Sequence, residues 1–530
     1  MKINYIKKSL ICFGLLTLVG CTDNFEEINS NPDGFTQEEV TQDFNHIRAP
    51  FKTMFENVMV NTPGWKYQVA IDLSGNNWGG YTAAPGFDGA NNLSYALSDN
   101  WNLWGWEAAY AQVMSNFLKV EKEAKGKYDD FYAFALIIKV ETMHKVTDAW
   151  GPIVYSKLGT TDAVIAYDSQ EEVYNLMFKE LDFAVEELTK RYDAIPTTEK
   201  NNPTSFTKTD RSTYDGNYKQ WVKFANSLRL RLAMRIVKAN PTLAKAEAEK
   251  AVSQKFGVFT EKADSFIIDI DVVKHPLLVP ADDYNDSRMS ADMESILGGY
   301  NDPRIGIYFK PSTQFPGEYK GIRTGALLGD KSLHVNFSTF GDGVRKQQVV
   351  WMNTAEVYFL RAEGALRGWN MDGDAETLYK AGIAASFDQQ GAGGVADYIA
   401  NNTDTAKDYV DPVTAANNGA AVNDVTVAWD GAAANEVKLQ KIITQKWIAN
   451  FPDGMEAWSD HRRTGYPKLL PILNNQSAGV ISTELGVRRI NFVTTEKDGN
   501  PGGVDTGKAK LNGPDNGATR VWWDVDAPNF

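Results

Sequence analysis

The sequence predicts a mainly α-helical protein with long loops and little β-structure. Two observations lead to this fold class. Apolar residues recur at spacings of three and four in several segments, which indicates amphipathic helices. Between these segments lie long stretches rich in Gly and Asn, and loops of such length in a compact domain are often functional. The long stretches are residues 61–100, 271–303, 310–347, 391–433 and 471–518.

The N-terminus is typical of an exported lipoprotein. Three lysines precede a short apolar run, and Leu18-Val19-Gly20-Cys21 ends it. The run is too short to cross a bilayer, so it indicates an export signal. The small residue before Cys21 completes a lipobox, which predicts cleavage before Cys21 and lipid on its sulfur; an ordinary secretory signal ending near a cysteine is the alternative. We expect a signal peptide over 1–20, the lipidated Cys21 with a flexible linker over 21–35, and a single domain over 36–530.

Helical periodicity recurs along the body of the chain. Ser169 and Glu172 form a capping box at the start of one helix, and Asn240-Pro241 ends another. The predicted helices are Thr36–Val60, Trp104–Ala124, Asp129–Val146, a segment opening at Ser169, Asn217–Ala239 and Glu436–Asn450. A short run, FIIDIDVV at Phe266–Val273, is strand-like.

One pair of segments has the size of a structural repeat. Asn353–Trp369 (NTAEVYFLRAEGALRGW) is followed by Asp374–Phe387 (DAETLYKAGIAASF), with small residues such as Gly364 where the second helix would approach. This alternation of small and large residues fits a tetratricopeptide unit. A plain helical hairpin fits the same segment equally well.

Composition excludes several classes of site and partner. The chain carries a formal net charge of −14, which disfavours nucleic acid and anionic lipid surfaces as partners. Of its two cysteines, Cys12 lies inside the signal, so the mature chain can form no internal disulfide. No later run approaches the roughly 20 apolar residues of a spanning helix, so we expect a soluble body held to a membrane by its lipid.

Catalytic and metal-binding motifs are missing from the sequence. The five histidines form no HExxH pair, and no GxSxG nucleophile elbow is present. Asn370, Asp372 and Asp374 alternate like the start of a calcium loop, but the turn glycine comes too early, so a helix cap is favoured. Absence of these motifs is weak evidence against an enzyme. Paired carboxylates of a glycoside hydrolase are defined in space, however, and sequence does not exclude them.

The segment 76–106 is unusually aromatic. Trp78 and Tyr81 stand among Asn, Asp and Gly in a stretch without helical period. Flat rings stack on the apolar faces of sugars, while side chains such as Asn77 bond the hydroxyls. The other interpretation is that these rings fasten the loop to the helices; it is favoured for Trp101, Trp104 and Trp106, and both stay open for Trp78 and Tyr81.

A second loop, 281–304, offers the same mixture of side chains. Asp283, Tyr284 and Arg288 combine charge, hydrogen-bonding groups and one ring. Arg304, after Asp302-Pro303, is expected to close a turn or a salt bridge instead. The Trp522-Trp523-Asp524 run near the C-terminus is expected to plug the core.

Motifs along the whole chain resemble the SusD/RagB-like outer-membrane lipoproteins, in their SusD-like, starch-binding-associating subgroup. The matching pieces are CTDNFEEINSNP after the lipobox, TDAWGPIVYS (147–156), NDPR (301–304), VVWMNTAEVYFLRAEGALRGW (349–369), KIITQKWIANFPDGMEAWSDHRRTGYP (441–467) and RVWWD (520–524).

The resemblance implies a SusD-like fold, in which tetratricopeptide-like helical pairs form a scaffold for long ligand-binding loops, and a surface location as the lid of a SusC-type TonB-dependent transporter. Such proteins bind a glycan, or in some members a peptide, that the transporter imports. They are not enzymes and carry no obligatory cofactor, so the resemblance implies no enzymatic activity and no cofactor here. Because no fixed motif marks their ligand residues, loop position and chemistry alone select the ligand-binding candidates: Asn77, Trp78, Tyr81, Asp283, Tyr284 and Arg288. A peptide-binding member of the same family and, further off, a surface glycoside hydrolase are the alternatives.

Overall fold

The computed structural model describes residues 44–58, 63–268, 275–346 and 349–530. The predicted signal peptide, Cys21, the linker and the strand-like residues after Ile268 lie outside the described residues. The chain divides into two units, Met1–Ala49 and Pro50–Phe530, and the description that follows concerns the second. The prediction of a single domain from residue 36 onward stays a prediction.

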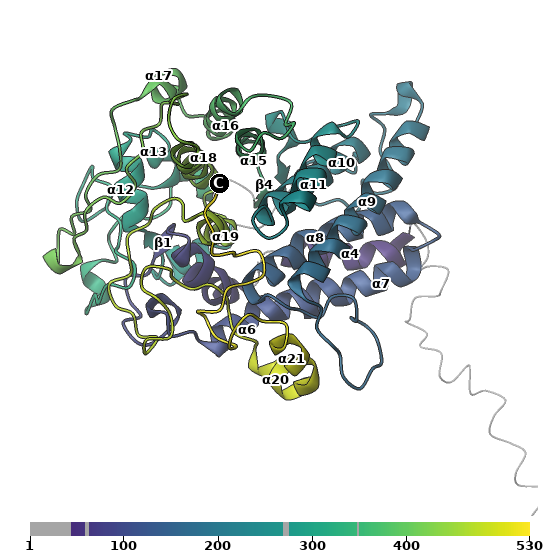
Figure 1. The fold of residues 1–530 in the computed structure, drawn as a ribbon, viewed down its shortest axis with the longest axis horizontal. Coiled ribbons are helices and arrows are strands. Elements are labelled where there is room, and N and C mark those ends of the chain that lie inside the picture. Colours follow the sequence, from purple (N-terminus) through teal and green to yellow (C-terminus); the bar gives the residue numbers. More distant parts are fainter. Residues whose placement is uncertain (1–43, 59–62, 269–274, 347–348) are drawn as a thin grey trace, which may run out of the picture. The chain divides into compact units, whose positions relative to one another are not determined.

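Helices dominate the described residues (Figure 1), which confirms the predicted fold class. Three of the helical segments, η2, η4 and η7, have the wider π geometry. The α-helices are α4 Asn45–Asn57, α5 Gly64–Tyr67, α6 Asp99–Glu107, α7 Ser115–Ala124, α8 Asp129–Trp150, α9 Gln170–Ala194, α10 Tyr218–Arg235, α11 Pro241–Ser253, α12 Ala291–Gly299, α13 Ile305–Tyr308, α14 Asp342–Arg345, α15 Thr354–Leu366, α16 Ala375–Gln390, α17 Val395–Ala400, α18 Asn435–Asn450, α19 Gly454–Thr464, α20 Thr494–Gly499 and α21 Pro501–Lys508; the π segments are η2 Gln68–Asn76, η4 Ala108–Met114 and η7 Val279–Asp283.

The described strands are short and join distant parts of the chain. The first antiparallel pair places Thr82 opposite Met289, and the second places Phe266 opposite Met352. The strands are β1 Thr82–Ala83, β2 Phe266–Ile267, β3 Arg288–Met289 and β4 Val350–Met352. The β1–β3 pair therefore holds the two loops from which the sequence selected ligand residues.

The scaffold consists of helices that pack in sequence order. α7 to α11 each contact the next, and α15 packs on α16, α18 and α10 (Figure 1). The predicted capping box is present, because Ser169 accepts from the Glu172 amide while Glu172 accepts from Ser169. The helix expected over Asn217–Ala239 ends earlier, at Arg235, and Asn240-Pro241 begins α11 rather than ending α10.

The α15–α16 pair matches the predicted repeat candidate. Asn353 and Asp374 cap the two helices, so the acidic NMDGDAE stretch serves as a helix start, as favoured. Close approach depends on a glycine of the second helix: a Cβ on Gly382 would lie 2.7 Å from the Phe359 ring. Gly364, which the sequence suggested for this contact, instead faces Met371, at the turn between the helices.

Ion pairs lie buried where α10, α15, α18 and α19 meet. Arg231 forms two hydrogen bonds to the Glu356 carboxylate, of 2.8 and 2.7 Å. Lys446 lies 2.7 Å from Glu456 and 2.6 Å from Asp460. Burial alone would raise a carboxyl pKa here, yet neighbouring arginines outweigh it at Glu363 and lower its pKa to about 2. The buried cationic side chains named here are therefore each paired with a buried carboxylate.

Two further interpretations from the sequence are confirmed. Arg304 is fully buried and pairs with Asp302 at 2.6 Å, which closes the predicted turn. Trp523 is fully buried, and its indole N–H donates to Asp148 at 2.6 Å, so it plugs the core near the chain end.

Candidate functional site

The first predicted loop is fastened to the helices at Tyr81. This residue is fully buried, and its hydroxyl donates to the Trp447 carbonyl at 2.5 Å. Its ring lies 5.1 Å from that of Trp447 and 5.3 Å from that of Phe451. Of the two interpretations left open for Tyr81, the structure favours fastening, because no face of this ring is free to stack on a sugar.

Trp78 is also buried, but it borders a cavity. It is 7% exposed, and its indole N–H donates to the Asn92 carbonyl at 3.0 Å. The ring packs 4.9 Å from Trp458. The cavity beside it, the Trp78 cavity, holds about 600 Å³ and opens to solvent; Asp292, Leu470 and Leu485 line it as well.

Asn77 stands between two cavities. Both it and Thr324 line the Trp78 cavity and also a second one of about 340 Å³, the Phe87 cavity. The Asn77 side chain donates to the Thr82 carbonyl at 3.2 Å, while its own oxygen has no hydrogen-bond partner. The two cavities therefore share a polar wall.

The second predicted loop divides into an exposed part and a structural part. Asp283 and Tyr284 are exposed. Arg288 is 4% exposed and donates to three carbonyls, of Val335, Ala281 and Ser287, and to the Asn285 side chain. Its guanidinium is committed to holding the loop, so a ligand cannot reach it in this conformation.

Tyr284 lies close to the first loop. Lys331 donates to the Tyr284 carbonyl at 2.9 Å. The same lysine would lie 3.8 Å from a Cβ placed on Gly86. The structure therefore brings the exposed part of the second loop toward Phe87, whereas Arg288 and Tyr81 serve the framework.

Phe87 is the aromatic residue that sequence reasoning did not select. It is 39% exposed and adopts a left-handed backbone with φ of 70°. Such a conformation is strained for a bulky residue and concentrates at functional sites. Asn91 holds the strained turn by donating to the carbonyls of Phe87 and Gly89, both at 2.9 Å. The available signal was the turn sequence PGFDG, which places one ring between two glycines.

Three loops form one surface around these cavities, which we call the loop face: residues 84–97, 321–335 and 470–487. Asp88 accepts hydrogen bonds from the Leu328 and Gly329 amides, of 3.1 and 2.7 Å, and the Gln476 amide donates to Ser94 at 2.7 Å. Gly325 has φ of 68°, and a Cβ there would lie 2.2 Å from Ile472, so this crossing requires glycine. Six large apolar side chains are exposed on the loop face: Phe87, Leu327, Leu333, Leu473, Val480 and Leu485.

Unpartnered polar atoms gather beside the two cavities. Unpartnered buried side-chain atoms occur at several places in the described chain, and three of them belong to Asn77, Arg323 and Thr324. They are an amide oxygen that accepts, a guanidinium Nε that donates and a hydroxyl that can do both. A buried polar atom without a partner costs about 1–3 kcal/mol. A ligand that supplied these hydrogen bonds would recover that free energy.

Burial also perturbs the charges at the loop face. It raises the pKa of Asp292 to about 6, although the Leu470 amide, which donates to it at 2.7 Å, and Arg323 act against the rise. Burial lowers the pKa of Arg323 in turn. His461, on the wall of the Trp78 cavity, has a pKa lowered to about 4, mainly by burial.

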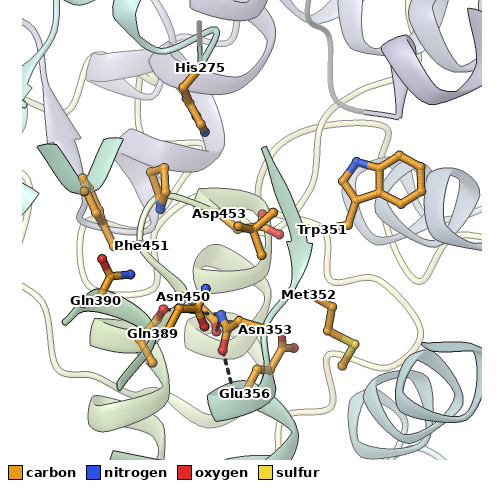
Figure 2. A pocket seen from close by; sticks show the side chains of 14 residues that line it. His275, Trp351, Met352, Asn353, Glu356, Gln389, Gln390, Asn450, Phe451 and Asp453 are labelled. Atoms are coloured by element: carbon orange, nitrogen blue, oxygen red, sulfur yellow. Dashed lines mark hydrogen bonds between the residues drawn. The ribbon is translucent and has the colours of Figure 1, made fainter. Parts of the chain in front are cut away.

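A separate pocket of about 510 Å³ lies between β4, α15 and α18 (Figure 2). Asn353 accepts from the Glu356 amide at 2.8 Å and donates to Asn450 at 3.0 Å. Among the described residues that line it, none has a buried side-chain atom without a partner. The walls of the Trp78 and Phe87 cavities, by contrast, contain three such atoms.

A family model, described as "SusD-like: Susd and RagB outer membrane lipoprotein", matches residues 27–524. The chain belongs to the SusD-like family. The resemblance seen in the sequence is thereby confirmed over most of the chain. No curated protein matches it. Within the described part of this SusD-like chain, no helix is both long and apolar enough to cross a membrane.

Solved SusD-like structures share the fold. A chitin-binding SusD homologue from Flavobacterium johnsoniae is 60% identical, with a TM-score of 0.89, over 92% of this chain and 100% of that one. A homologue from Bacteroides vulgatus is 34% identical, with a TM-score of 0.86, over 92% and 99% of the two chains. A third, from Bacteroides uniformis, is 37% identical, with a TM-score of 0.84, over 91% and 99%.

Proposed function

We propose that this SusD-like protein binds a chitin-type oligosaccharide at the loop face and delivers it to a SusC-type TonB-dependent transporter in the outer membrane. Cys21 would carry the lipid anchor at the cell surface. The main support for a chitin-type ligand is the 60% identity to a chitin-binding homologue over that homologue's whole length. The family description supports the outer-membrane location.

The chemistry of the loop face supports this ligand. Each N-acetylglucosamine unit presents an apolar ring face and an acetamido group with one N–H and one C=O. Phe87 offers an exposed ring for the apolar face. The unpartnered oxygen of Asn77 can accept the N–H, and the unpartnered Arg323 Nε and Thr324 hydroxyl can donate to the C=O. These atoms are closed to solvent, so the proposal requires the loops to part slightly as the glycan enters.

The sequence-selected residues take different parts in this proposal. Trp78 lines the larger cavity, and Tyr284 stands exposed near the first loop, so both are proposed ligand contacts together with Asn77. Asp283 is exposed on the same loop as Tyr284 and is proposed as a rim contact. Tyr81 and Arg288 would act indirectly, by holding the two loops in place.

Calorimetric titration tests the ligand class. Chito-oligosaccharides should bind, and malto-oligosaccharides and a peptide pool should not. Phe87→Ala should weaken chito-oligosaccharide binding by about 1–3 kcal/mol, as expected for loss of a stacked ring. Phe183→Ala, which removes a ring of similar exposure (38%) on α9, is the matched control and should bind like the wild type. Binding of peptides alone would overturn the glycan proposal in favour of a peptide-binding member of the family.

Two further measurements test delivery without catalysis. Chito-oligosaccharide incubated with the protein should be recovered intact; shortened products would make the protein a hydrolase. The protein should also co-purify with the TonB-dependent transporter of its own membrane after mild solubilisation. A lipoprotein recovered free of any transporter would contradict the delivery step while leaving glycan binding standing.

A further inference from the structure

An exposed tryptophan lies beyond the loop face. Trp65, on the short helix α5, is 39% exposed. Its ring meets that of Trp104, on α6, edge to face, with centroids 4.8 Å apart and an angle of 88°. Exposed rings are costly to leave in water, and tryptophan is the residue most enriched at sites of contact.

A row of rings connects Trp65 with the loop face. Phe87 packs edge to face on Trp101, at 5.7 Å. Trp101 and Trp104 are three residues apart on α6, so they share one side of the helix with a rise of about 4.5 Å between them. Trp104 then meets Trp65. We call these four residues the aromatic row; its two ends are exposed and its two middle rings are half-buried.

The middle rings are half-buried and pack against buried clusters. Trp101 packs on the cluster of Leu73, Ala84 and Leu93. Trp104 packs on the cluster of Ala70 and Ala108. The outer rings, Phe87 and Trp65, therefore rest on neighbours that are themselves packed, which lowers the cost of ordering them when a ligand binds.

Polar groups beside Trp65 suit a neutral polyol. The Lys66 ammonium lies 4.0 Å from the Trp104 ring centroid and 3.6 Å from the Glu107 carboxylate. The pair supplies donors and acceptors next to the rings, yet it carries no net charge. An anion would find Lys66 already neutralised, whereas sugar hydroxyls can bond to both partners.

We propose that Trp65, Trp104, Lys66 and Glu107 form a second sugar subsite, at the far end of the aromatic row. It would take additional units of the same glycan, and only chains long enough to extend from Phe87 along α6 would occupy it. This inference rests on the proposed glycan binding at the loop face. It adds that affinity increases with chain length, and that Trp65 is the source of the increase.

The test is calorimetric titration of chito-oligosaccharides of increasing length against the wild type and Trp65→Ala. The wild type should bind long chains more tightly than short ones. Trp65→Ala should bind the shortest ligand unchanged and lose about tenfold in affinity for the longest, as expected for one aromatic contact. Trp65→Phe should keep most of the length dependence, because it preserves a ring. Phe183→Ala, whose ring also rests on another ring, Tyr132 at 5.4 Å, is the control.

The outcomes separate this subsite from the loop face. Full length dependence in Trp65→Ala, or an equal loss for short and long chains, would overturn the subsite while leaving the proposed function intact. Failure of the wild type to bind any chito-oligosaccharide would overturn the proposed function itself. Unchanged near-ultraviolet circular dichroism of Trp65→Ala, apart from its one lost ring, checks that the variant is folded.

Discussion

The Figure 2 pocket and the two cavities of the loop face differ in how their polar groups are satisfied. Around the Figure 2 pocket, Glu356 bonds to Arg231 and Asn353 bonds to Asn450. At the loop face, Asn77 and Thr324 each keep a buried atom without a partner. The first arrangement lowers the free energy of the folded chain by itself. The second leaves hydrogen bonds that a ligand entering these cavities could make, and making them would favour binding.

The largest expected effect is a loss of stability when an ion pair beside the Figure 2 pocket is broken. Glu356→Ala would leave Arg231 without its two-bond partner and Lys446 without a carboxylate 3.5 Å away, both buried. Removing one member of a buried ion pair costs about 3–5 kcal/mol. Urea denaturation should show this loss in the free energy of unfolding.

The control for that variant is an exposed pair. Lys380 and Glu376 lie 2.6 Å apart on α16, each 44% exposed, so Lys380→Ala should change stability by less than about 0.5 kcal/mol. A Glu356→Ala protein as stable as the Lys380→Ala protein would show that the pairs around the Figure 2 pocket do not support the fold.

The next effect concerns the charge buried at the loop face. A pKa of about 6 at Asp292, in place of its ordinary 3.8, means that the folded protein disfavours the ionised form. This group therefore stabilises the fold fully below pH 3.8, and that contribution is lost as pH rises through 6. Asp292→Asn keeps an oxygen for the Leu470 amide and removes the charge, so it should gain stability over the wild type by roughly 3 kcal/mol above pH 7.

The pH profile isolates Asp292 from its neighbours. Thermal denaturation of both proteins from pH 4 to pH 8 should show the variant's advantage growing toward neutral pH. His461, with a pKa lowered to about 4, is present in both proteins, so its own effect on stability cancels in the difference between them. An advantage that is constant with pH would mean that the pKa of Asp292 is the same in the folded and unfolded states, so that burial does not raise it.

Local sequence patterns predicted the scaffold well, because helices depend on neighbours in the chain. The capping box at Ser169 and the helix start at Asp374 were readable from a few residues. The burial of Tyr81 was not, because the Trp447 carbonyl that receives its hydroxyl is 366 residues away. Loop residues without a period have no sequence signal that distinguishes a fastening ring from a binding ring.

The same limit explains the two other departures at the candidate site. Arg288 has the chemistry of a ligand residue, yet carbonyls as distant as that of Val335 occupy its donors. Phe87 becomes the exposed ring through a left-handed backbone that a bulky residue rarely adopts. Tertiary contacts decided each case, so residue type and loop membership alone did not separate exposed side chains from those that hold the loops.

The smallest expected effect is on the stability of two Thr→Val variants. It is the sharpest test, because the same substitution should destabilise the protein at one position and stabilise it at the other. Thr354, beside the Figure 2 pocket, donates its hydroxyl to the Glu261 carbonyl at 2.7 Å, whereas the buried hydroxyl of Thr324 has no partner. Valine has nearly the same shape as threonine and no hydroxyl. Thr354→Val should therefore lose about 1 kcal/mol of stability, and Thr324→Val should gain about the same amount.

The order of the two variants in ligand affinity should be the reverse of their order in stability. If the Thr324 hydroxyl is kept for the ligand, Thr324→Val should be more stable than the wild type and bind chito-oligosaccharide more weakly, while Thr354→Val should bind normally. Denaturation and titration on the same preparations give both quantities. A Thr324→Val protein that is stabilised and binds with undiminished affinity would show that the unmet bond at this position is a defect of packing, and would remove Thr324 from the site.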